Sequence, residues 1–234
     1  MSNLLYTNFL TLLLTGLLFT ACNQKGGEGE STMKQVTGSG LPDLKKSLKK
    51  YIDGRESFIA VSFQDTDQQF YLGINDTISL HAASTMKVPV MMEAFRQSET
   101  GRFSLDDSLT VRNEFRSIMD NSLYSLDIGE DSGDRLYSMI GSKESIRGLI
   151  KDMLTILLNQ HLRKKLPAKL PVDVKVAHKT GRITKINHDS GIIFPQAYTP
   201  YILVVLTKGF EDHKEAEECI ADISLMVYDW YTKN

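Results

Sequence analysis

The amino-acid sequence predicts an α+β fold in which one antiparallel sheet is built from both ends of the chain. β-Rich runs lie at residues 57–63 and 69–74 near the start of the folded region, and at residues 175–180, 186–194 and 200–208 near its end. Between these two groups, residues 84–98 and 144–166 have helical periodicity instead, and so do residues 211–231 after them. Residues 105–140 are mixed and polar, with weak signals. Because segregated strands and helices bury their apolar faces against each other, we expect helices to pack on this sheet.

The composition is that of an ordinary globular protein. The 234 residues are 41% apolar and 24% charged, which is enough material for one sizeable core or two lobes. The 27 basic and 29 acidic residues leave a formal net charge of -2. This balance gives no indication of a nucleic-acid-binding surface.

The first 22 residues read as an export signal. They are nearly uncharged, and their apolar run from Phe9 to Phe19 is too short to span a bilayer comfortably. The ending Thr20-Ala21-Cys22 resembles a bacterial lipoprotein signal, in which Cys22 is lipidated and anchors the protein to the membrane. A plain secretory signal cut near Ala21 is the alternative. Both predict export to the bacterial cell envelope, either as a periplasmic protein or as a membrane-anchored lipoprotein.

Residues 23–40 are rich in Gly, Ser, Glu and Lys, and this composition predicts a flexible tether. The folded domain is therefore expected to span residues 41–234. Cys22 and Cys219 are the two cysteines of the sequence, and lipidation of the first would leave the second alone, so we expect no structural disulfide. Cys219 lies in an amphipathic stretch, which favours a buried structural thiol.

Four helices follow from periodicity and from their end signals. Residues 41–53 form the first, which Gly54 can close. Its lysines lie at positions typical of a solvated face. A second helix should run from Ser84 to about Ser98, with some distortion near Pro89 because proline has no N–H. A third pattern keeps its apolar spacing over residues 144–166 and predicts one helix of about six turns. Residues 211–231 predict an amphipathic helix that closes the chain.

A hydroxyl and an amine lie three residues apart at the start of the second helix, in the segment Ala83-Ser84-Thr85-Met86-Lys87. Residues at this spacing share a helix face. A serine attacks a carbonyl group at neutral pH only when a neighbour takes its proton. Lysine can do so in its uncharged form, which burial in an apolar cleft favours. We therefore predict Ser84 as a nucleophile and a buried Lys87 as its base.

A second motif about ninety residues later supports this interpretation. His178-Lys179-Thr180-Gly181 places a cation, a hydroxyl and a glycine inside a strand-like run. S-x-x-K followed by K-T-G is the pairing of class A β-lactamases and penicillin-binding proteins. The amino-acid sequences around Ser84 and around Lys179 resemble those of class A β-lactamases in particular. The resemblance extends from about residue 41 to residue 234. This resemblance implies a β-lactamase/transpeptidase-like fold, with a sheet lobe, a helical lobe and the site in the crevice between them.

The resemblance also implies roles for the individual residues. Ser84 would form an acyl-enzyme with a β-lactam or a cell-wall peptide, and Lys87 would accept its proton. The main-chain N–H groups of Ser84 and Arg182 would hold the oxyanion. Lys179 would attract the carboxylate of the substrate, Thr180 would hydrogen-bond to it, and Gly181 would leave room for its approach. No cofactor is implied, and we expect a monomer.

The sequence departs from the family in its middle part. Thr155 and Ile156 form an apparent join, before which the chain resembles the helix that leads to the family's Ser-Asp-Asn motif, and after which it resembles a helix just before K-T-G. Several dozen family residues would then be absent, so the helical lobe is expected to be reduced. No Ser-Asp-Asn occurs anywhere in the chain, and residues 120–122 have these letters in another order. Glu144 cannot inherit by position the role of the glutamate that activates the deacylating water.

Three functions remain open at this stage. The first is a β-lactamase-type serine hydrolase that would confer antibiotic resistance, with deacylation impaired by the gap. The second is a penicillin-binding or D,D-peptidase-type acyltransferase. The third is a catalytically inactive envelope lipoprotein.

The five histidines do not fall at metal-ligand spacing with acidic or cysteine neighbours, so no metal site is expected. The pair His188-Asp189 is interpreted as structural, since adjacent side chains of a strand point to opposite faces.

Overall fold

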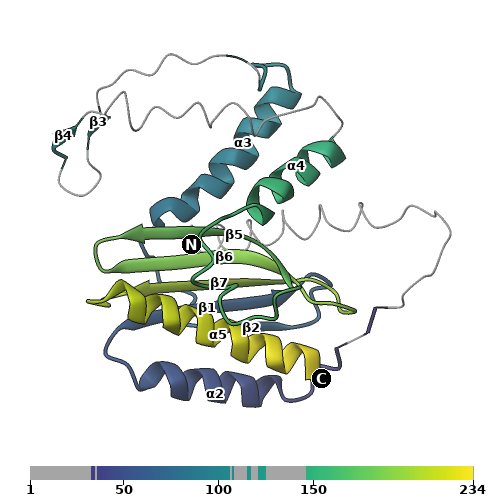
Figure 1. Cartoon of the computed structure of the whole chain (residues 1–234), viewed down its shortest axis with the longest axis vertical. Coiled ribbons are helices and arrows are strands. Elements are labelled where there is room, and N and C mark those ends of the chain that lie inside the picture. Colours follow the sequence, from purple (N-terminus) through teal and green to yellow (C-terminus); the bar gives the residue numbers. More distant parts are fainter. Residues whose placement is uncertain are drawn as a thin grey trace. The chain divides into compact units, whose positions relative to one another are not determined.

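The computed structural model describes residues 33–34, 36–105, 107, 115–116, 121–124 and 146–233 (Figure 1). The predicted signal, with Cys22, and most of the predicted tether lie outside the described residues. The chain divides into two compact units: one is made of Met1–Met91 and Met153–Asn234, and the other of Met92–Asp152. The two are described separately below.

The first unit contains a five-stranded sheet with the strand order β2-β1-β7-β6-β5. Its strands are β1 (Phe58–Asp65), β2 (Tyr71–Ile74), β5 (Lys175–Ile183), β6 (Ile186–Phe194) and β7 (Tyr201–Lys208). Every neighbouring pair is antiparallel, and β1 pairs directly with β7. The prediction of one antiparallel α+β sheet drawn from both chain ends is confirmed.

Helices α2 (Leu41–Asp53) and α5 (His213–Lys233) pack against each other and against this sheet (Figure 1). Their apolar faces and the sheet enclose a core in which Leu48, Phe63 and Ile220 are fully buried. At one end of the core, Phe63, Tyr201 and Tyr231 form an aromatic cluster, and the rings of the two tyrosines lie 4.8 Å apart. The lysines of α2 are exposed, as its pattern predicted.

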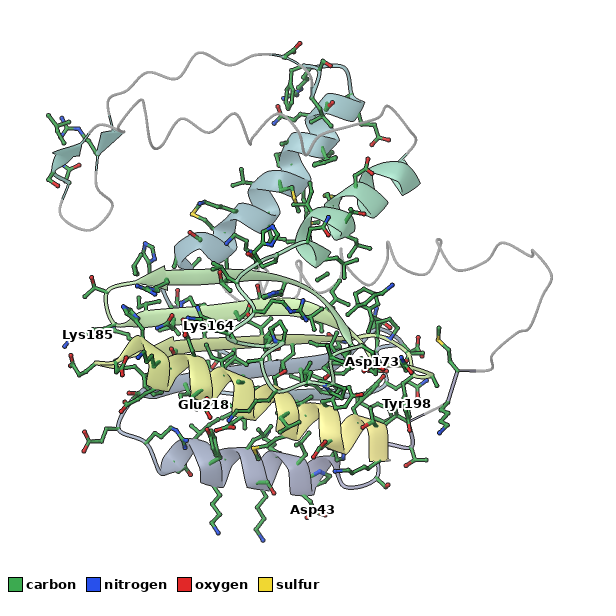
Figure 2. The ribbon with its side chains drawn as sticks, viewed as in Figure 1. Asp43, Lys164, Asp173, Lys185, Tyr198 and Glu218 are labelled. Atoms are coloured by element: carbon green, nitrogen blue, oxygen red, sulfur yellow. The ribbon has the colours of Figure 1, made fainter. Side chains whose placement is uncertain are left out.

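The packed part of the chain begins before Leu41, within the stretch predicted as a tether. Val36 is buried in the core, and the main-chain carbonyl of Ser39 accepts a hydrogen bond of 3.1 Å from the Trp230 indole. Further along the first unit, Tyr198 donates its hydroxyl to the carbonyl of Thr232 at 2.6 Å (Figure 2). These contacts join the start and the end of the described chain to the same core.

The second unit holds most of α3 (Lys87–Glu99), the short strands β3 (Phe115–Arg116) and β4 (Leu123–Tyr124), and the first part of α4 (Ile146–Leu158). Phe115 and Tyr124 face each other in an antiparallel pair. None of the described helices is both long and apolar enough to cross a membrane.

Helix α4 ends at Leu158, so the predicted single helix over residues 144–166 is wrong at its C-terminal end. Leu162 is 61% exposed, whereas Leu166 is fully buried in the core of the sheet. The main-chain N–H of Leu166 donates to the carboxylate of Asp189 at 3.1 Å rather than to a helical carbonyl. The apolar spacing therefore continues past the helix, but Leu162 is exposed and Leu166 packs in the core of the sheet.

Candidate active site

Ser84 lies in a tight turn that leads directly into α3. The 3-10 turn η1 (Ala83–Met86) is followed by α3 at Lys87, whose main-chain N–H donates to the carbonyls of Ser84 and Thr85. Pro89 falls in the first turn of α3, where a missing N–H costs no helical hydrogen bond. The distortion expected near Pro89 is thus a 3-10 turn just before the α-helix.

The residue before Ser84 has a strained backbone. Ala83 has a φ of 47°, a left-handed conformation that residues with a side chain seldom adopt. Its N–H donates to Nδ1 of His81 at 3.0 Å, and the Thr85 hydroxyl donates to the carbonyl of Ala82 at 2.6 Å. These two local bonds hold the turn in the shape that presents Ser84.

His188 of β6 fastens this turn to the sheet. Its Nδ1 lies 3.1 Å from the N–H of Thr207 and 2.7 Å from the carbonyl of Asn187, and its Nε2 lies 2.9 Å from the carbonyl of His81, which can only accept. A main-chain N–H can only donate, so the ring carries its proton on Nε2 and donates to His81. Burial lowers the pKa of His188, and the histidine is therefore neutral around pH 7.

Gly181 of β5 touches the same turn. A Cβ atom placed at Gly181 would lie 3.1 Å from the Cβ of Ala83 and 3.2 Å from both the carbonyl oxygen of Ala82 and Cγ2 of Thr85. These distances are shorter than ordinary carbon contacts. The structure thus brings together the two predicted motifs, and a side chain larger than that of glycine would be crowded at the point where they meet.

The other residues of the K-T-G motif follow along β5. Lys179 is half-buried and its Nζ donates to the carbonyl of Thr180 at 2.7 Å. Burial lowers the pKa of Lys179, and the nearby charge of Lys87 lowers it further, which places both cations in one electrostatic neighbourhood. Thr180 is buried, and the side chain of Arg182 is exposed. The role predicted for Arg182 concerns its main-chain N–H alone.

Lys87 itself is exposed, which differs from the predicted buried base. The apolar neighbours Met86, Val88 and Val90 favour burial of Lys87, but the side chains of Met86 and Val90 are themselves 54% and 57% exposed. In the described structure, the half-buried and buried lysines of this region are Lys179 and Lys165.

Lys165 is a site residue that the sequence reasoning missed. It is only 4% exposed, and its Nζ donates to the carbonyls of Gly181 at 3.2 Å and His188 at 3.0 Å. Burial lowers its pKa to about 8, against the opposing attraction of Asp189. In the sequence it follows another lysine in an apolar helical pattern, so nothing local distinguished it from a solvated charge.

Asp189 lies beside this lysine and is fully buried. Its carboxylate accepts the Nδ1–H of His178 at 2.9 Å, together with the N–H of Leu166. Asp189 and His188 therefore bind different partners on different sides of β6, as strand alternation predicts. They do not form a catalytic pair.

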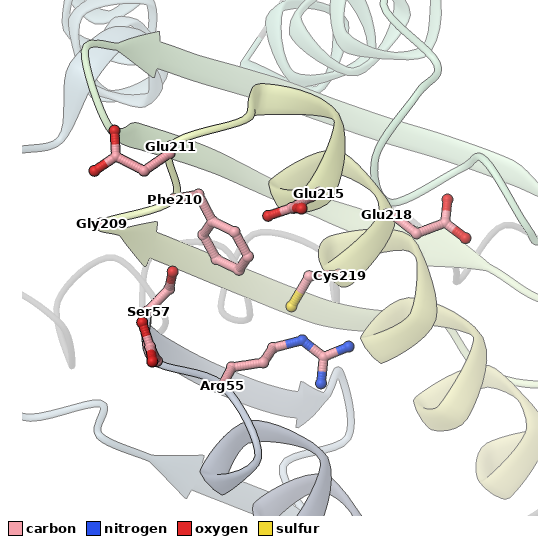
Figure 3. Close-up of a pocket in the computed structure, with 9 residues that line it drawn as sticks. Arg55, Ser57, Gly209, Phe210, Glu211, Glu215, Glu218 and Cys219 are labelled. Atoms are coloured by element: carbon pink, nitrogen blue, oxygen red, sulfur yellow. The ribbon is translucent and has the colours of Figure 1, made fainter.

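A separate cavity of about 620 Å³ lies at the N-terminal end of α5 (Figure 3). Its lining includes Arg55, Phe210 and Glu215, but neither predicted motif. Cys219 contributes to its wall and is 1% exposed, and burial raises the pKa of this thiol to about 11. The prediction of a buried structural thiol is confirmed. Among the described side chains, no group of three or more His, Cys, Asp or Glu residues could hold a metal ion.

The sheet, the two helices on it and the Ser84 turn against β5 define a β-lactamase/transpeptidase-like fold. The solved structure of PBP-A superposes with a TM-score of 0.64 and 19% identity, over 83% of this chain and 97% of that chain. A class A beta-lactamase from Bacteroides cellulosilyticus gives 0.63 and 15% identity, over 82% and 98%. A variant of PBP-A described as an acyl-enzyme complex with penicillin G gives 0.65 and 19% identity, over 83% and 98%.

The chain belongs to the beta-lactamase enzyme family, whose model matches residues 43–156 and 147–231. The match is thus in two segments that overlap at residues 147–156, the region that contains the join suggested by the sequence. A search of curated proteins found no match.

Proposed function

We propose that this chain is a serine hydrolase of the class A β-lactamase type that opens the β-lactam amide through an acyl-enzyme on Ser84. The observation that carries the proposal is the contact between the Ser84 turn and β5 at Gly181. This contact sets the nucleophile beside the strand that would bind the substrate. Family membership supplies the reaction class.

In the proposed acylation, Ser84 Oγ attacks the β-lactam carbonyl carbon while Lys87 Nζ accepts its proton. The N–H groups of Ser84 and Arg182 would donate to the oxyanion. The C–N bond then breaks, the nitrogen takes up the proton, and an ester to Ser84 remains. Lys179 would attract the carboxylate of the substrate, with Thr180 as a hydrogen-bond donor to it.

Deacylation is proposed to be impaired. The sequence has no Ser-Asp-Asn motif and no segment equivalent to the one that carries the family's deacylating glutamate. An ester without a positioned water and base hydrolyses slowly, because general-base catalysis typically contributes about a hundredfold to ten-thousandfold in rate. The exposed position of Lys87 further favours a slow first step.

A second candidate function is acyl transfer on cell-wall peptides. The absence of a Ser-Asp-Asn motif favours it over a rapid β-lactamase, and a variant of PBP-A, which has a similar fold, is described as an acyl-enzyme with penicillin G. Such an enzyme would share the acylation step and would release the terminal residue of a stem-peptide mimic. An inactive envelope protein would do neither.

Intact-mass measurement after incubation with penicillin G tests the proposal. The expected result is a stable adduct of one penicillin per chain, absent in Ser84→Ala and present in the control Ser98→Ala, together with slow turnover of a chromogenic cephalosporin. Rapid multiple turnover would contradict the impaired deacylation, and release of the terminal residue from the peptide mimic would favour the second candidate. The absence of any Ser84 adduct would refute the acyl chemistry.

We further propose export to the cell envelope as a lipid-anchored monomer with Cys22 as the lipidated residue. Its support is the resemblance of the first 22 residues to a lipoprotein signal. A Cys22→Ser variant should lose incorporation of labelled fatty acid and leave the membrane fraction. Unchanged membrane association of this variant would contradict the anchor.

A further inference from the structure

Lys165 occupies a position that is costly for a cation. It is 4% exposed, and within the described part of the chain its hydrogen-bond acceptors are two main-chain carbonyl oxygens rather than a carboxylate. A buried ammonium group is stabilised less by such neutral acceptors than by an ion pair. The chain thus keeps a charge at the junction of β5 and β6 where an apolar side chain would be easier to bury.

One of the two acceptors is the carbonyl of the Gly181–Arg182 peptide, whose N–H is a proposed oxyanion donor. The Gly181 carbonyl and the Arg182 N–H are parts of the same peptide unit. The structure has no cis peptide among its described residues, so this unit is planar and trans, and its C=O and N–H point in opposite directions. Fixing the carbonyl oxygen on Lys165 therefore fixes the direction of the Arg182 N–H.

The ammonium group also changes the strength of that N–H as a donor. A cation at 3.2 Å from the Gly181 oxygen withdraws electron density from the amide and makes its N–H more acidic. The effect is largest in a dry environment, and both Lys165 and Gly181 are buried.

The second carbonyl links Lys165 to the nucleophile turn. His188 is the residue that faces Gly181 across the β5–β6 pair, and its side chain donates to the carbonyl of His81. Lys165 thus binds both members of one cross-strand pair. One of them touches the Ser84 turn directly, and the other fastens it through an imidazole.

Lys165 is itself held in place by its successor in the chain. The N–H of Leu166 donates to Asp189, and the carbonyl of Leu166 accepts the hydroxyl of Ser224 from α5 at 2.8 Å. The main chain beside the lysine is therefore bonded to β6 on one side and to α5 on the other. A side chain orients a peptide group only if its own position is fixed, and these two bonds fix the main chain next to Lys165.

We propose that Lys165 is a positioning residue that orients and polarises the Gly181–Arg182 peptide and so strengthens the second oxyanion donor. The proposal rests on the proposed acylation of Ser84. It adds a residue outside both sequence motifs to the acylation machinery, and it makes the oxyanion donor depend on the charge of a side chain that does not touch the substrate.

The charged groups around Lys165 determine the pH range over which its ammonium group loses its charge. Asp189 and Glu217 favour its charged form, whereas burial, Arg182 and Lys179 favour the neutral form, and its pKa falls to about 8. The cation is therefore present at pH 7 and is lost as the pH rises above about 8. Its contribution to acylation should disappear over the same range.

The test compares Lys165→Met with wild type and with the control Lys164→Met, which removes the exposed neighbouring charge (Figure 2). Each protein is acylated with penicillin G carrying ¹³C at the β-lactam carbonyl. The rate of adduct formation is followed by intact mass, and the ester C=O stretch by infrared difference spectroscopy. A weaker oxyanion donor slows acylation and moves this stretch to higher wavenumber.

Lys165→Met should acylate about tenfold to a hundredfold more slowly than wild type, somewhat less than the loss of a whole oxyanion donor, and its ester band should move upward. Lys164→Met should match wild type in both. The ratio of wild-type to Lys165→Met rates should fall toward one above about pH 8. If Lys165→Met does not fold, Lys165→Arg is the second variant, because it keeps its charge up to pH 9.5: the wild-type ester band should move upward between about pH 7 and pH 9.5, and the band of Lys165→Arg should move less.

The outcomes separate this inference from the function on which it rests. If wild type forms no adduct, the proposed function is wrong, and the proposed role of Lys165 is then wrong as well. If wild type is acylated, but folded Lys165→Met reacts at the same rate with the same ester band, Lys165 is only a structural residue and the proposed function stands. A wild-type band that does not move with pH would also refute the inference.

Discussion

Replacing Gly181 by alanine tests the contact on which the site depends. The added Cβ would lie 3.1 Å from the Cβ of Ala83 and 3.2 Å from both the Ala82 oxygen and Cγ2 of Thr85. Two of these three atoms are main chain or a Cβ bonded to it, so they cannot move by a simple side-chain rotation. Gly181 does not have a positive φ, and alanine therefore meets no backbone strain of its own there.

The size of the effect follows from these distances. Ordinary carbon contacts begin at about 3.5 Å, so the Ser84 turn must move away from β5 by about 0.4 Å. Overpacking of this kind typically costs about 1–3 kcal/mol of unfolding free energy. Displacing a catalytic group by about 1 Å can cost a hundredfold in rate, so about 0.4 Å should slow acylation of Ser84 by about tenfold.

Urea unfolding and the rate of penicillin adduct formation measure the two effects. Gly54→Ala is the matched control, because a Cβ there would have its nearest neighbour at 3.7 Å, and Gly54 has a φ of −77°. It should change the unfolding free energy by less than about 0.5 kcal/mol. Adding Ala83→Gly to Gly181→Ala removes the nearest of the clashing atoms, and since Ala83→Gly also relieves the backbone strain at φ 47°, it is measured alone as well. Ala83→Gly should stabilise the Gly181→Ala protein by about 1 kcal/mol more than it stabilises wild type.

The reasoning would be refuted by a Gly181→Ala protein as stable and as reactive as wild type. That result would mean that β5 and the Ser84 turn are not in contact in the folded protein. A loss of stability that Ala83→Gly does not relieve would place the strain elsewhere on β5.

Three further predictions concern buried groups of the first unit. His188→Leu leaves the buried N–H of Thr207 and the part-buried carbonyl of His81 without their side-chain partner and should cost about 1–3 kcal/mol in urea unfolding. A cost below about 0.5 kcal/mol would contradict the role of His188 in fastening the Ser84 turn. The pKa of Lys165 falls to about 8 on folding, so the unfolded state holds more protons above that pH, and the stability of wild type relative to Lys165→Met should rise by about 2 kcal/mol between pH 7 and pH 9.5. A constant difference would show that this pKa is not lowered. In a Cys22→Ser background, Cys219 has a pKa of about 11 and should react with a disulfide reagent only after unfolding, while labelling of the native protein would show an open site.

Local patterns were sufficient for most of the sheet and its helices. The predicted helix at residues 41–53 matches α2 at both ends, because a helix start at Leu41-Pro42 and a glycine stop are both local signals. The strand at 186–194 matches β6 in the same way. The apolar spacing of α4 continues beyond the end of the helix at Leu158, and there it predicts a helix that the chain does not form. The main-chain N–H of Leu166 donates to Asp189, a residue distant in the sequence, and no local pattern shows this.

The candidate site was predictable where its residues form a motif and not where burial alone gives them a role. Ser84 and Gly181 were found because their neighbours in the sequence carry a recognisable chemistry. The structural role predicted for His188 agrees with its bonds to Thr207 and His81. Lys165 was missed, because its two acceptors lie on strands β5 and β6, distant in the sequence. The exposed Lys87 shows the converse, since apolar neighbours in the sequence did not provide cover in space.

The proposed acylation residues all belong to the first unit, so the acylation step that we propose does not depend on the second unit for its residues. The two matched segments of the family model overlap at residues 147–156, and the boundary between the compact units falls at Asp152 and Met153. A segment lost at this place leaves intact the five-stranded sheet, the core under α2 and α5, and the contact at Gly181. On the proposed function, the sequence keeps the nucleophile and its partners on this unit but has no Ser-Asp-Asn motif, and for this reason we propose that the protein is acylated and then hydrolyses slowly.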